Sequence, residues 1–177
     1  MIRCYVTDRR QGDVIASARR CIDTGVDYIQ IREKDLPTAA LLELAVRIRD
    51  LAAGSATRVL VNDRLDVAIA AQIDGVHLPA YGLPAVQVRP RVRILGVSTH
   101  SVAEAIAAEQ AQADFIVFGP IFETPEKKPV GLEALRCVTA AVHVPVLAIG
   151  GITHANSKHV VGAGAAGIAA IRLFQSL

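Results

Sequence analysis

The sequence predicts a compact (β/α)8 TIM barrel, formed by residues 1–177 as one α/β domain. Eight short runs rich in β-branched residues alternate with longer segments of helical periodicity. Nearly every run is apolar on both faces, which is typical of parallel strands that are covered on both sides. With 177 residues, 52% of them hydrophobic, the chain is long enough for one buried core and too short for two ordinary domains.

The expected strands follow one another at regular intervals. They are residues 4–7, 28–32, 58–62, 75–78, 94–98, 115–119, 146–150 and 168–171. The segments between them repeat apolar residues at three- and four-residue steps, which predicts helices at 13–24, 37–53, 64–72, 101–110, 132–141 and 156–161. Ser101 and Glu104 have the spacing of a capping box. The fourth helix would have to come from residues 84–90, which are few and interrupted by proline, so a regular helix is poorly supported there.

The end of the chain is short for this architecture. Only residues 172–177 follow the last strand, so we expect a truncated final helix and a flank that is bare or covered by another subunit. This predicts a homodimer. A doubly wound open sheet is the structural alternative, but it usually has a glycine-rich loop after its first strand, and none follows Thr7.

Composition excludes several classes of protein. The net charge of +2 comes from interspersed charges and only 4% of residues are aromatic, which argues against a nucleic-acid partner. The longest apolar stretch, residues 160–171, is short for a membrane span, and no secretion signal precedes the first strand, so we expect a cytoplasmic protein without a membrane partner. Cys4, Cys21 and Cys137 are expected to be reduced core thiols.

Polar residues gather where the expected strands end. In a barrel these ends form the active face, so we expect the polar residues around one opening. A single arginine or lysine there is more often a solvated charge, whereas the whole pattern is harder to explain in that way. The residues are Gln30, Arg32, Lys34, Asn62, Asp63, His77, Ser98, His100, Thr124, Lys127, Lys128, Gly150 and Gly151.

Some of these residues suggest specific roles in binding or catalysis. Gly150 and Gly151, before a helix expected to start near residues 153–156, are typical of a phosphate-binding turn, although a tight turn alone would also need glycine. His100 is the strongest acid–base candidate, because imidazole titrates near neutral pH. His77 fits a core position or a site position equally well. The loop at residues 121–131 is a candidate lid.

A series of motifs follows along nearly the whole chain. They are residues 5–8 (YVTD), 30–34 (QIREK), 61–64 (VNDR), 75–78 (GVHL), 96–101 (GVSTHS), 118–122 (FGPIF) with Thr124, Lys127 and Lys128, and 148–152 (AIGGI). In this order they resemble the superfamily of thiamine phosphate synthase and TenI-type thiazole tautomerase. The resemblance implies a (β/α)8 barrel that handles thiazole phosphates.

The synthase branch joins a pyrimidine diphosphate to a thiazole phosphate and uses Mg²⁺. The resemblance implies that Asp63 would be one metal ligand and that the diphosphate would contact Gln30, Arg32, Lys34, Asn62 and Lys127. Synthases supply a second aspartate in a Gly-Gln-x-Asp stretch directly after the His-Leu pair. Here residues 79–82 read Pro-Ala-Tyr-Gly, so one anionic ligand is missing.

The tautomerase branch moves a proton within a carboxy-thiazole phosphate and needs no metal. By this resemblance His100 would be the catalytic residue, and the phosphate would be held by Gly150, Gly151, Ile171 and Arg172, the last replacing a small serine. His77, Ser98 and Thr124 would complete the binding site. We therefore expect an isomerase without a cofactor that binds a thiazole phosphate. A Mg²⁺-dependent synthase is the alternative, and a non-catalytic phosphate-binding regulator is the second alternative.

Overall fold

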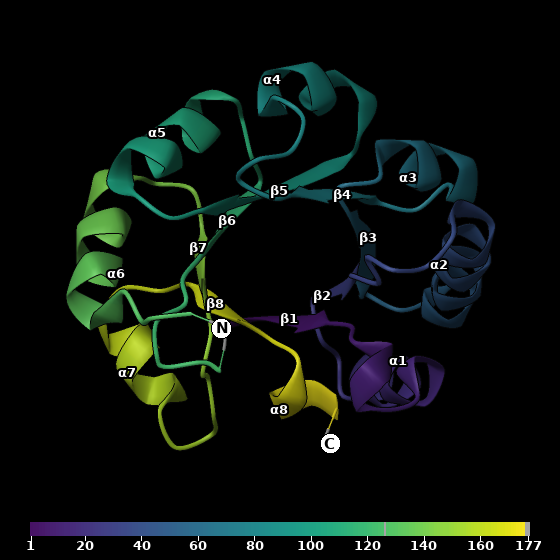
Figure 1. Cartoon of the computed structure of the whole chain (residues 1–177), viewed down its shortest axis with the longest axis horizontal. Helices are drawn as coiled ribbons and strands as arrows, with labels where there is room; N and C mark the ends of the chain where they lie inside the picture. The colour runs from purple at the N-terminus through teal and green to yellow at the C-terminus, as the bar shows by residue number, and fades with distance from the viewer. Residues whose placement is uncertain (126, 176–177) are drawn as a thin grey trace.

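A computed structural model describes residues 1–125 and 127–175 and confirms the predicted TIM barrel (Figure 1). All neighbouring strands are parallel, and β8 pairs with β1 to close the barrel in sequence order. The strands are β1 (Ile2–Val6), β2 (Tyr28–Ile31), β3 (Arg58–Asn62), β4 (Gly75–Leu78), β5 (Ile94–Thr99), β6 (Phe115–Phe118), β7 (Val146–Ile149) and β8 (Gly167–Ala170).

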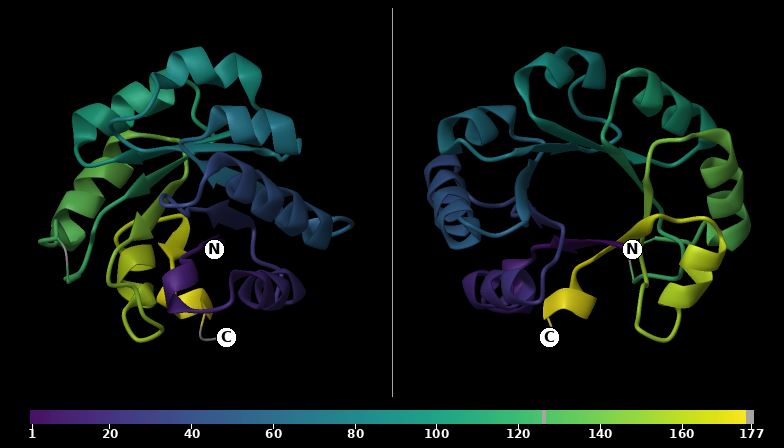
Figure 2. Two further views of the ribbon diagram at one scale, coloured as in Figure 1. Left: turned by 45° about the vertical axis from the view of Figure 1, so that its right-hand side comes forward. Right: turned by 180° about the vertical axis from the view of Figure 1, so that it is seen from behind.

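Helices form an outer ring around the strands, as the front view (Figure 1) and the view from behind (Figure 2) both show. They are α1 (Val14–Asp23), α2 (Thr38–Ala52), α3 (Leu65–Ala71), α4 (Ala85–Val88), α5 (Val102–Gln110), α6 (Gly131–Ala141), α7 (Ser157–Gly162) and α8 (Arg172–Gln175), with 3-10 turns at Arg9–Gln11 and Arg89–Arg91. None of the helices in the described part of the chain has the length and apolar character needed to cross a membrane.

The strands are apolar on both faces because each face has its own core. Along β6, Phe115 and Val117 belong to a small cluster inside the barrel, whereas Ile116 and Phe118 pack with the larger cluster beneath the helices. Gly96 makes room for this interior, because a Cβ at residue 96 would lie 2.4 Å from the ring of Phe115. The alternation explains the continuous apolar runs in the sequence.

Side chains fix the starts of two helices. Asp13 accepts hydrogen bonds from the backbone N–H groups of Ile15 (2.9 Å) and Ala16 (3.1 Å), so it caps α1. Ser101 caps α5 by accepting from the N–H of Glu104 at 3.2 Å, as predicted. The Glu104 carboxylate does not complete the box on Ser101, because it accepts instead from the N–H of His100 at 2.7 Å.

The end of the chain is less bare than expected. Although α8 is short, it packs against α1 and buries Leu173 and Phe174. The Gln175 amide donates to the carbonyl of Asp8 at 2.9 Å, which ties the end of the chain to the β1–α1 loop. The short helix therefore covers this flank within one subunit, and the homodimer stays a prediction. Cys4 and Cys21 are buried thiols, whereas Cys137 is exposed, contrary to expectation.

His77 lies inside the barrel on β4, fully buried beside the ring of Phe115 at a centroid distance of 5.8 Å. Burial, and to a lesser extent the positive charge of Arg32, lowers the pKa of His77 from its usual 6.5 to about 3. The imidazole is therefore neutral at physiological pH.

This burial predicts acid sensitivity. The unfolded chain takes up a proton on His77 below about pH 6.5, but the folded protein does so only near pH 3. The free energy of unfolding should therefore fall as the pH is lowered through this window, by up to about 1.4 kcal/mol per pH unit from His77. Urea unfolding at several pH values should show a flatter profile for His77→Gln. The exposed His159→Gln is the control, and an unchanged slope in His77→Gln would contradict the assignment.

Candidate active site

A cavity of about 890 Å³ opens where the strands end at their carboxyl termini. Every residue that the sequence predicted as catalytic or binding lines it, and this finding places them together without testing their roles. These residues are Gln30, Arg32, Lys34, Asn62, His77, Ser98, His100, Thr124, Lys127, Gly150, Gly151, Ile171 and Arg172.

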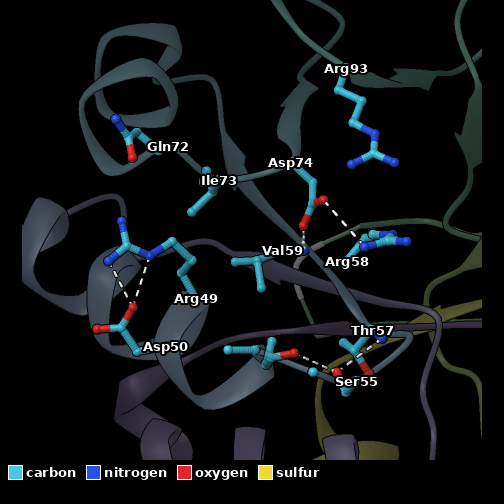
Figure 3. A pocket seen from close by; sticks show the side chains of 13 residues that line it. Arg49, Asp50, Ser55, Thr57, Arg58, Val59, Gln72, Ile73, Asp74 and Arg93 are labelled. Atoms are coloured by element: carbon cyan, nitrogen blue, oxygen red, sulfur yellow. Dashed lines mark hydrogen bonds and ion pairs between the residues drawn. The ribbon is translucent and has the colours of Figure 1, made fainter.

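A second cavity, of about 440 Å³, lies at the opposite end of the barrel, near the starts of β3, β4 and β5 (Figure 3). Four of its charged groups already contact one another in pairs. Arg49 contacts Asp50 at 2.7 Å, and Asp74 lies 3.8 Å from Arg58 and accepts from the N–H of Val59. Since barrels carry catalytic residues at the other end, the larger cavity is the candidate active site.

One wall of the larger cavity comes from the ends of β2 and β3. Gln30 donates from its amide to Asn62 at 3.3 Å, and Arg32 and Lys34 follow on the same face of the chain. Glu33 points to the other side, where it accepts from the Thr7 hydroxyl at 2.6 Å. Within residues 1–125 and 127–175, no carboxylate forms an ion pair with Arg32, Lys34 or Lys127. This wall therefore offers cationic groups to an anion.

Lys34 rests on Tyr81 at the edge of this wall. Its ammonium donates to the Tyr81 hydroxyl at 2.9 Å and lies 5.6 Å from the centre of the ring. The hydrogen bond from Lys34 lowers the pKa of Tyr81, which is 76% exposed. An anion that binds Lys34 therefore competes with the Tyr81 hydroxyl.

The floor of the cavity contains His77 and Ser98. Nε2 of His77 lies 2.8 Å from the Ser98 hydroxyl oxygen, and Nδ1 has no hydrogen-bond partner among the described residues. A proton on Nε2 leaves only a lone pair unsatisfied at Nδ1, which costs less than a buried N–H without an acceptor. We therefore assign Nε2 as the donor. The Ser98 hydroxyl proton is then free for a ligand.

His100 follows β5 at the opening of the cavity. Its Nδ1 lies 2.9 Å from the carbonyl oxygen of Gly119, which can only accept, so Nδ1 carries the proton in the neutral ring. This contact leaves the lone pair on Nε2. The imidazole is therefore oriented by the β6–α6 loop.

A second wall comes from the loops that follow β7 and β8. Gly150 and Gly151 have φ angles of 93° and 64°, a backbone conformation that favours glycine. The Gly150 carbonyl accepts from the N–H of Phe122 at 3.1 Å, which turns the N–H of Gly151 away from Phe122. The predicted helix at 156–161 is α7, which starts at Ser157. The glycine turn lies several residues before this helix, so it is the turn, rather than a helix terminus, that is the candidate anion-binding feature.

The structure also adds residues that sequence reasoning missed. Asp8, Arg10 and Gln11 follow β1 and line the cavity, and Gln11 accepts from Nε of Arg172 at 3.2 Å. The rule that polar residues after strands face the opening would have found them. His154 also lines the cavity, because it lies in the β7–α7 loop, of which residues 150–154 all line it.

Asp63 and Lys128 are absent from the described residues that line this cavity. Asp63 is half-buried at the end of β3, with a φ of 64°. Within the described ranges, no three or more histidine, cysteine, aspartate or glutamate side chains gather as a metal site. Asp63 therefore does not belong to such a group among the described residues.

Several proteins similar to this chain are named for the same activity. The chain is 41% identical over 175 residues to a thiamine-phosphate synthase from Chlorobium limicola, covering 95% of this chain and 83% of the relative. It is 45% identical over 161 residues to a thiamine-phosphate synthase from Methanoculleus marisnigri, covering 87% and 76%. A solved structure of a thiamine phosphate pyrophosphorylase from Pyrococcus furiosus matches with a TM-score of 0.90 and 34% identity, covering 99% of this chain and 90% of that one.

These relatives correct the expected activity. The expectation of an isomerase acting as a thiazole tautomerase is wrong, because relatives at this identity are named as synthases, which are transferases. The expectation placed too much weight on the missing aspartate. Mg²⁺ usually keeps several waters and binds substrate phosphates through one or two carboxylates, so one absent carboxylate does not exclude a diphosphate reaction.

Family membership rests on nearly the whole chain. A family profile described as thiamine monophosphate synthase matches residues 4–174, from the first strand to the last helix. The match includes every strand end that lines the larger cavity. The chain belongs to the thiamine monophosphate synthase family.

Proposed function

We propose that this chain is a thiamine phosphate synthase, a transferase that joins hydroxymethylpyrimidine diphosphate to a thiazole phosphate and releases pyrophosphate. The observation that carries this proposal is that one cavity is lined by two separate groups of residues suited to anions, the basic side chains after β2 and the glycine turn after β7. A reaction between two phosphorylated substrates needs both walls, whereas a reaction of one monophosphate needs one. The names of the relatives support the same activity.

The diphosphate fits the wall formed by β2 and β3. Arg32 and Lys34 supply positive charge, and the amides of Gln30 and Asn62 supply further hydrogen-bond donors. Lys127 approaches from the β6–α6 loop. The contacts of these groups with the diphosphate would strengthen as the C–O bond breaks, because negative charge then accumulates on the diphosphate oxygens.

The thiazole phosphate fits the wall formed by the loops after β7 and β8. Gly150 and Gly151 allow close approach of backbone to a phosphate, and Ile171 and Arg172 continue this wall after β8. Arg172 is oriented by Gln11, so it can add a charged contact without closing the turn. The two substrates would then meet above His77 and Ser98.

This reaction transfers the methylene carbon of the pyrimidine to the thiazole, whereas a tautomerase would transfer a proton. The ring nitrogen of the thiazole attacks the methylene carbon of the pyrimidine, so that a C–N bond forms while the C–O bond to the diphosphate breaks and its electrons leave with pyrophosphate. The attacking nitrogen carries no proton, so this step needs no general base. His100 is then a hydrogen-bonding group at the opening, and the Ser98 hydroxyl can donate to the pyrimidine.

The resemblance implies Mg²⁺ for such a reaction, but the side chains present do not fit a two-carboxylate metal site. Asp63 belongs to no group of three or more such side chains in the part of the chain that the structure describes, and a Cβ built at Gly82 would lie 2.9 Å from its Oδ1, so this neighbouring position carries no carboxylate. The mechanism therefore assigns positioning and charge stabilisation to Arg32, Lys34 and the amides. No step is assigned to a metal.

The proposal predicts product formation by the purified chain. With both substrates and MgCl2, thiamine phosphate and pyrophosphate should appear in equal amounts, and omission of either substrate should abolish both. Chromatography of thiamine phosphate and a coupled pyrophosphate assay measure them. Binding of thiazole phosphate without turnover would instead support a non-catalytic binding protein.

Lys34→Met should weaken use of the diphosphate substrate. Loss of a charge-assisted hydrogen bond corresponds to about a tenfold rise in KM for the pyrimidine diphosphate, with KM for thiazole phosphate unchanged. Lys158→Met, on α7 and outside the cavity, is the matched control and should behave as the wild type. Equal effects on both KM values would show that Lys34 does not distinguish the substrates.

Tyr81→Phe should improve use of the diphosphate substrate, in contrast to Lys34→Met. Removing the hydroxyl frees the Lys34 ammonium for the diphosphate and keeps the ring, so KM for this substrate should fall by about twofold to threefold. Steady-state kinetics at saturating thiazole phosphate measure it. A higher KM would mean that Tyr81 holds Lys34 in its binding position.

A further inference from the structure

A buried carboxylate separates two cations of the wall formed by β2 and β3. Glu33 lies between Arg32 and Lys34 in the chain, yet its side chain is only 2% exposed, whereas Arg32 is half-buried and Lys34 is exposed. The alternation that turns Arg32 and Lys34 toward the cavity turns Glu33 toward the end of β1. Glu33 is absent from the described residues that line the cavity, so it can act on a bound diphosphate only through its neighbours.

The β1–α1 loop holds the Glu33 carboxylate. Its Oε1 accepts from the Thr7 hydroxyl at 2.6 Å, and both of its oxygens accept from the backbone N–H of Arg9 at 3.1 Å. The Arg9 guanidinium adds an ion pair, with Nε at 3.9 Å from Oε2. A buried carboxylate needs hydrogen bonds and an opposite charge, and these contacts supply both. They tie the loop after β1 to the loop after β2.

Thr7 extends this contact to Arg32. Thr7 is fully buried directly after β1, and its hydroxyl oxygen accepts from the backbone N–H of Arg32 at 3.0 Å. A hydroxyl has a single proton, and because Thr7 donates it to Glu33, the lone pairs of the oxygen are left for the Arg32 N–H. The carboxylate therefore orients the hydroxyl, and the hydroxyl holds the backbone from which the Arg32 side chain begins.

Glu109 provides a carboxylate of the same kind away from the cavity. Its Oε1 accepts from the backbone N–H groups of His143 at 2.6 Å and Val144 at 2.8 Å, just before β7 begins. These residues lie at the end of the barrel opposite the cavity, and none of them lines it. Both glutamates therefore hold a loop through backbone N–H groups, but only the contacts of Glu33 lead to a cation that faces the cavity.

We propose that Glu33 is a positioning residue for the diphosphate, which acts through Thr7 on Arg32. A guanidinium binds phosphate oxygens best when its planar donors are aligned with them, so a fixed starting point for the side chain favours binding. A wall that is already ordered also loses less conformational freedom when the diphosphate binds. The inference rests on the proposed synthase activity, because that activity supplies the diphosphate, but its test needs no turnover.

The other substrate should be unaffected. Among the described residues, the glycine turn at Gly150 and Gly151 forms no hydrogen bond with Glu33, Thr7 or Arg32. The β1–α1 loop also has a separate anchor, the hydrogen bond between the Gln175 amide and the Asp8 carbonyl. A change at Glu33 should therefore weaken binding of the diphosphate and spare binding of the thiazole phosphate.

The test is binding of inorganic pyrophosphate and of thiazole phosphate to the purified chain in MgCl2 buffer, measured by isothermal titration calorimetry. Glu33→Gln should raise the Kd for pyrophosphate about tenfold and leave the Kd for thiazole phosphate within about twofold of the wild type, because its amide nitrogen faces donors where an oxygen accepted. Glu109→Gln is the matched control and should bind both ligands as the wild type does. Equal weakening of both ligands in Glu33→Gln, or no pyrophosphate binding by the wild type, would overturn the proposal.

A pair of variants at Thr7 tests the same inference if Glu33→Gln does not fold. Thr7→Val has nearly the same shape without the hydroxyl, and it should raise the Kd for pyrophosphate about tenfold because the Arg32 N–H loses its acceptor. Thr7→Ser keeps the hydroxyl and should restore the affinity to within about twofold of the wild type. Equal affinities of Thr7→Val and Thr7→Ser would show that the hydroxyl does not position Arg32, contrary to the proposal.

The double variant shows whether Glu33 and Thr7 act along one path. The Kd for pyrophosphate of Glu33→Gln combined with Thr7→Val should rise no further than that of the weaker-binding single variant, because either change already breaks the contact. Independent, multiplying effects would contradict the proposed path through Thr7. Absence of synthase activity would leave all of these binding results intact, so this inference and the proposed function fail separately.

Discussion

Closure of a parallel barrel requires every strand to be buried on both faces, and the other features of this chain depend on that constraint. Phe115 and Val117 fill the inside while Ile116 and Phe118 pack under the helices, so the strands have no polar face to offer. Polar chemistry is concentrated in the residues at and after the end of each strand. Because all strands run in the same direction, these residues meet at one end, where the larger cavity opens.

Within that cavity, the barrel separates the two groups of residues that we propose bind anions. The ends of β2 and β3 supply side-chain cations and amides, whereas the loops after β7 and β8 supply a backbone turn with Gly150 and Gly151. Between them, the neutral His77 holds Ser98 in a fixed orientation, because burial keeps the imidazole uncharged. The arrangement suits a reaction in which two phosphorylated molecules are placed side by side and one loses its diphosphate.

The second aspartate of the synthases is absent from this chain, but its absence is weaker evidence against a synthase than the sequence analysis assumed. Gly82 faces Asp63 and leaves one carboxylate where two would form a cation site, yet the relatives with 41% and 45% identity are named synthases. The two facts are compatible, because Mg²⁺ in general binds through one or two carboxylates together with waters and substrate phosphates.

The sequence by itself determined the barrel and the ring of residues at its opening, because short apolar runs and their polar ends depend on local spacing alone. It also identified Ser101 as a helix cap. Only the tertiary structure decided that α8 covers its flank, that Tyr81 holds Lys34, that His154 and Gln11 reach the cavity, and that Gly82 faces Asp63. These contacts join loops distant in the chain, and their geometry follows from barrel closure, which no local pattern encodes.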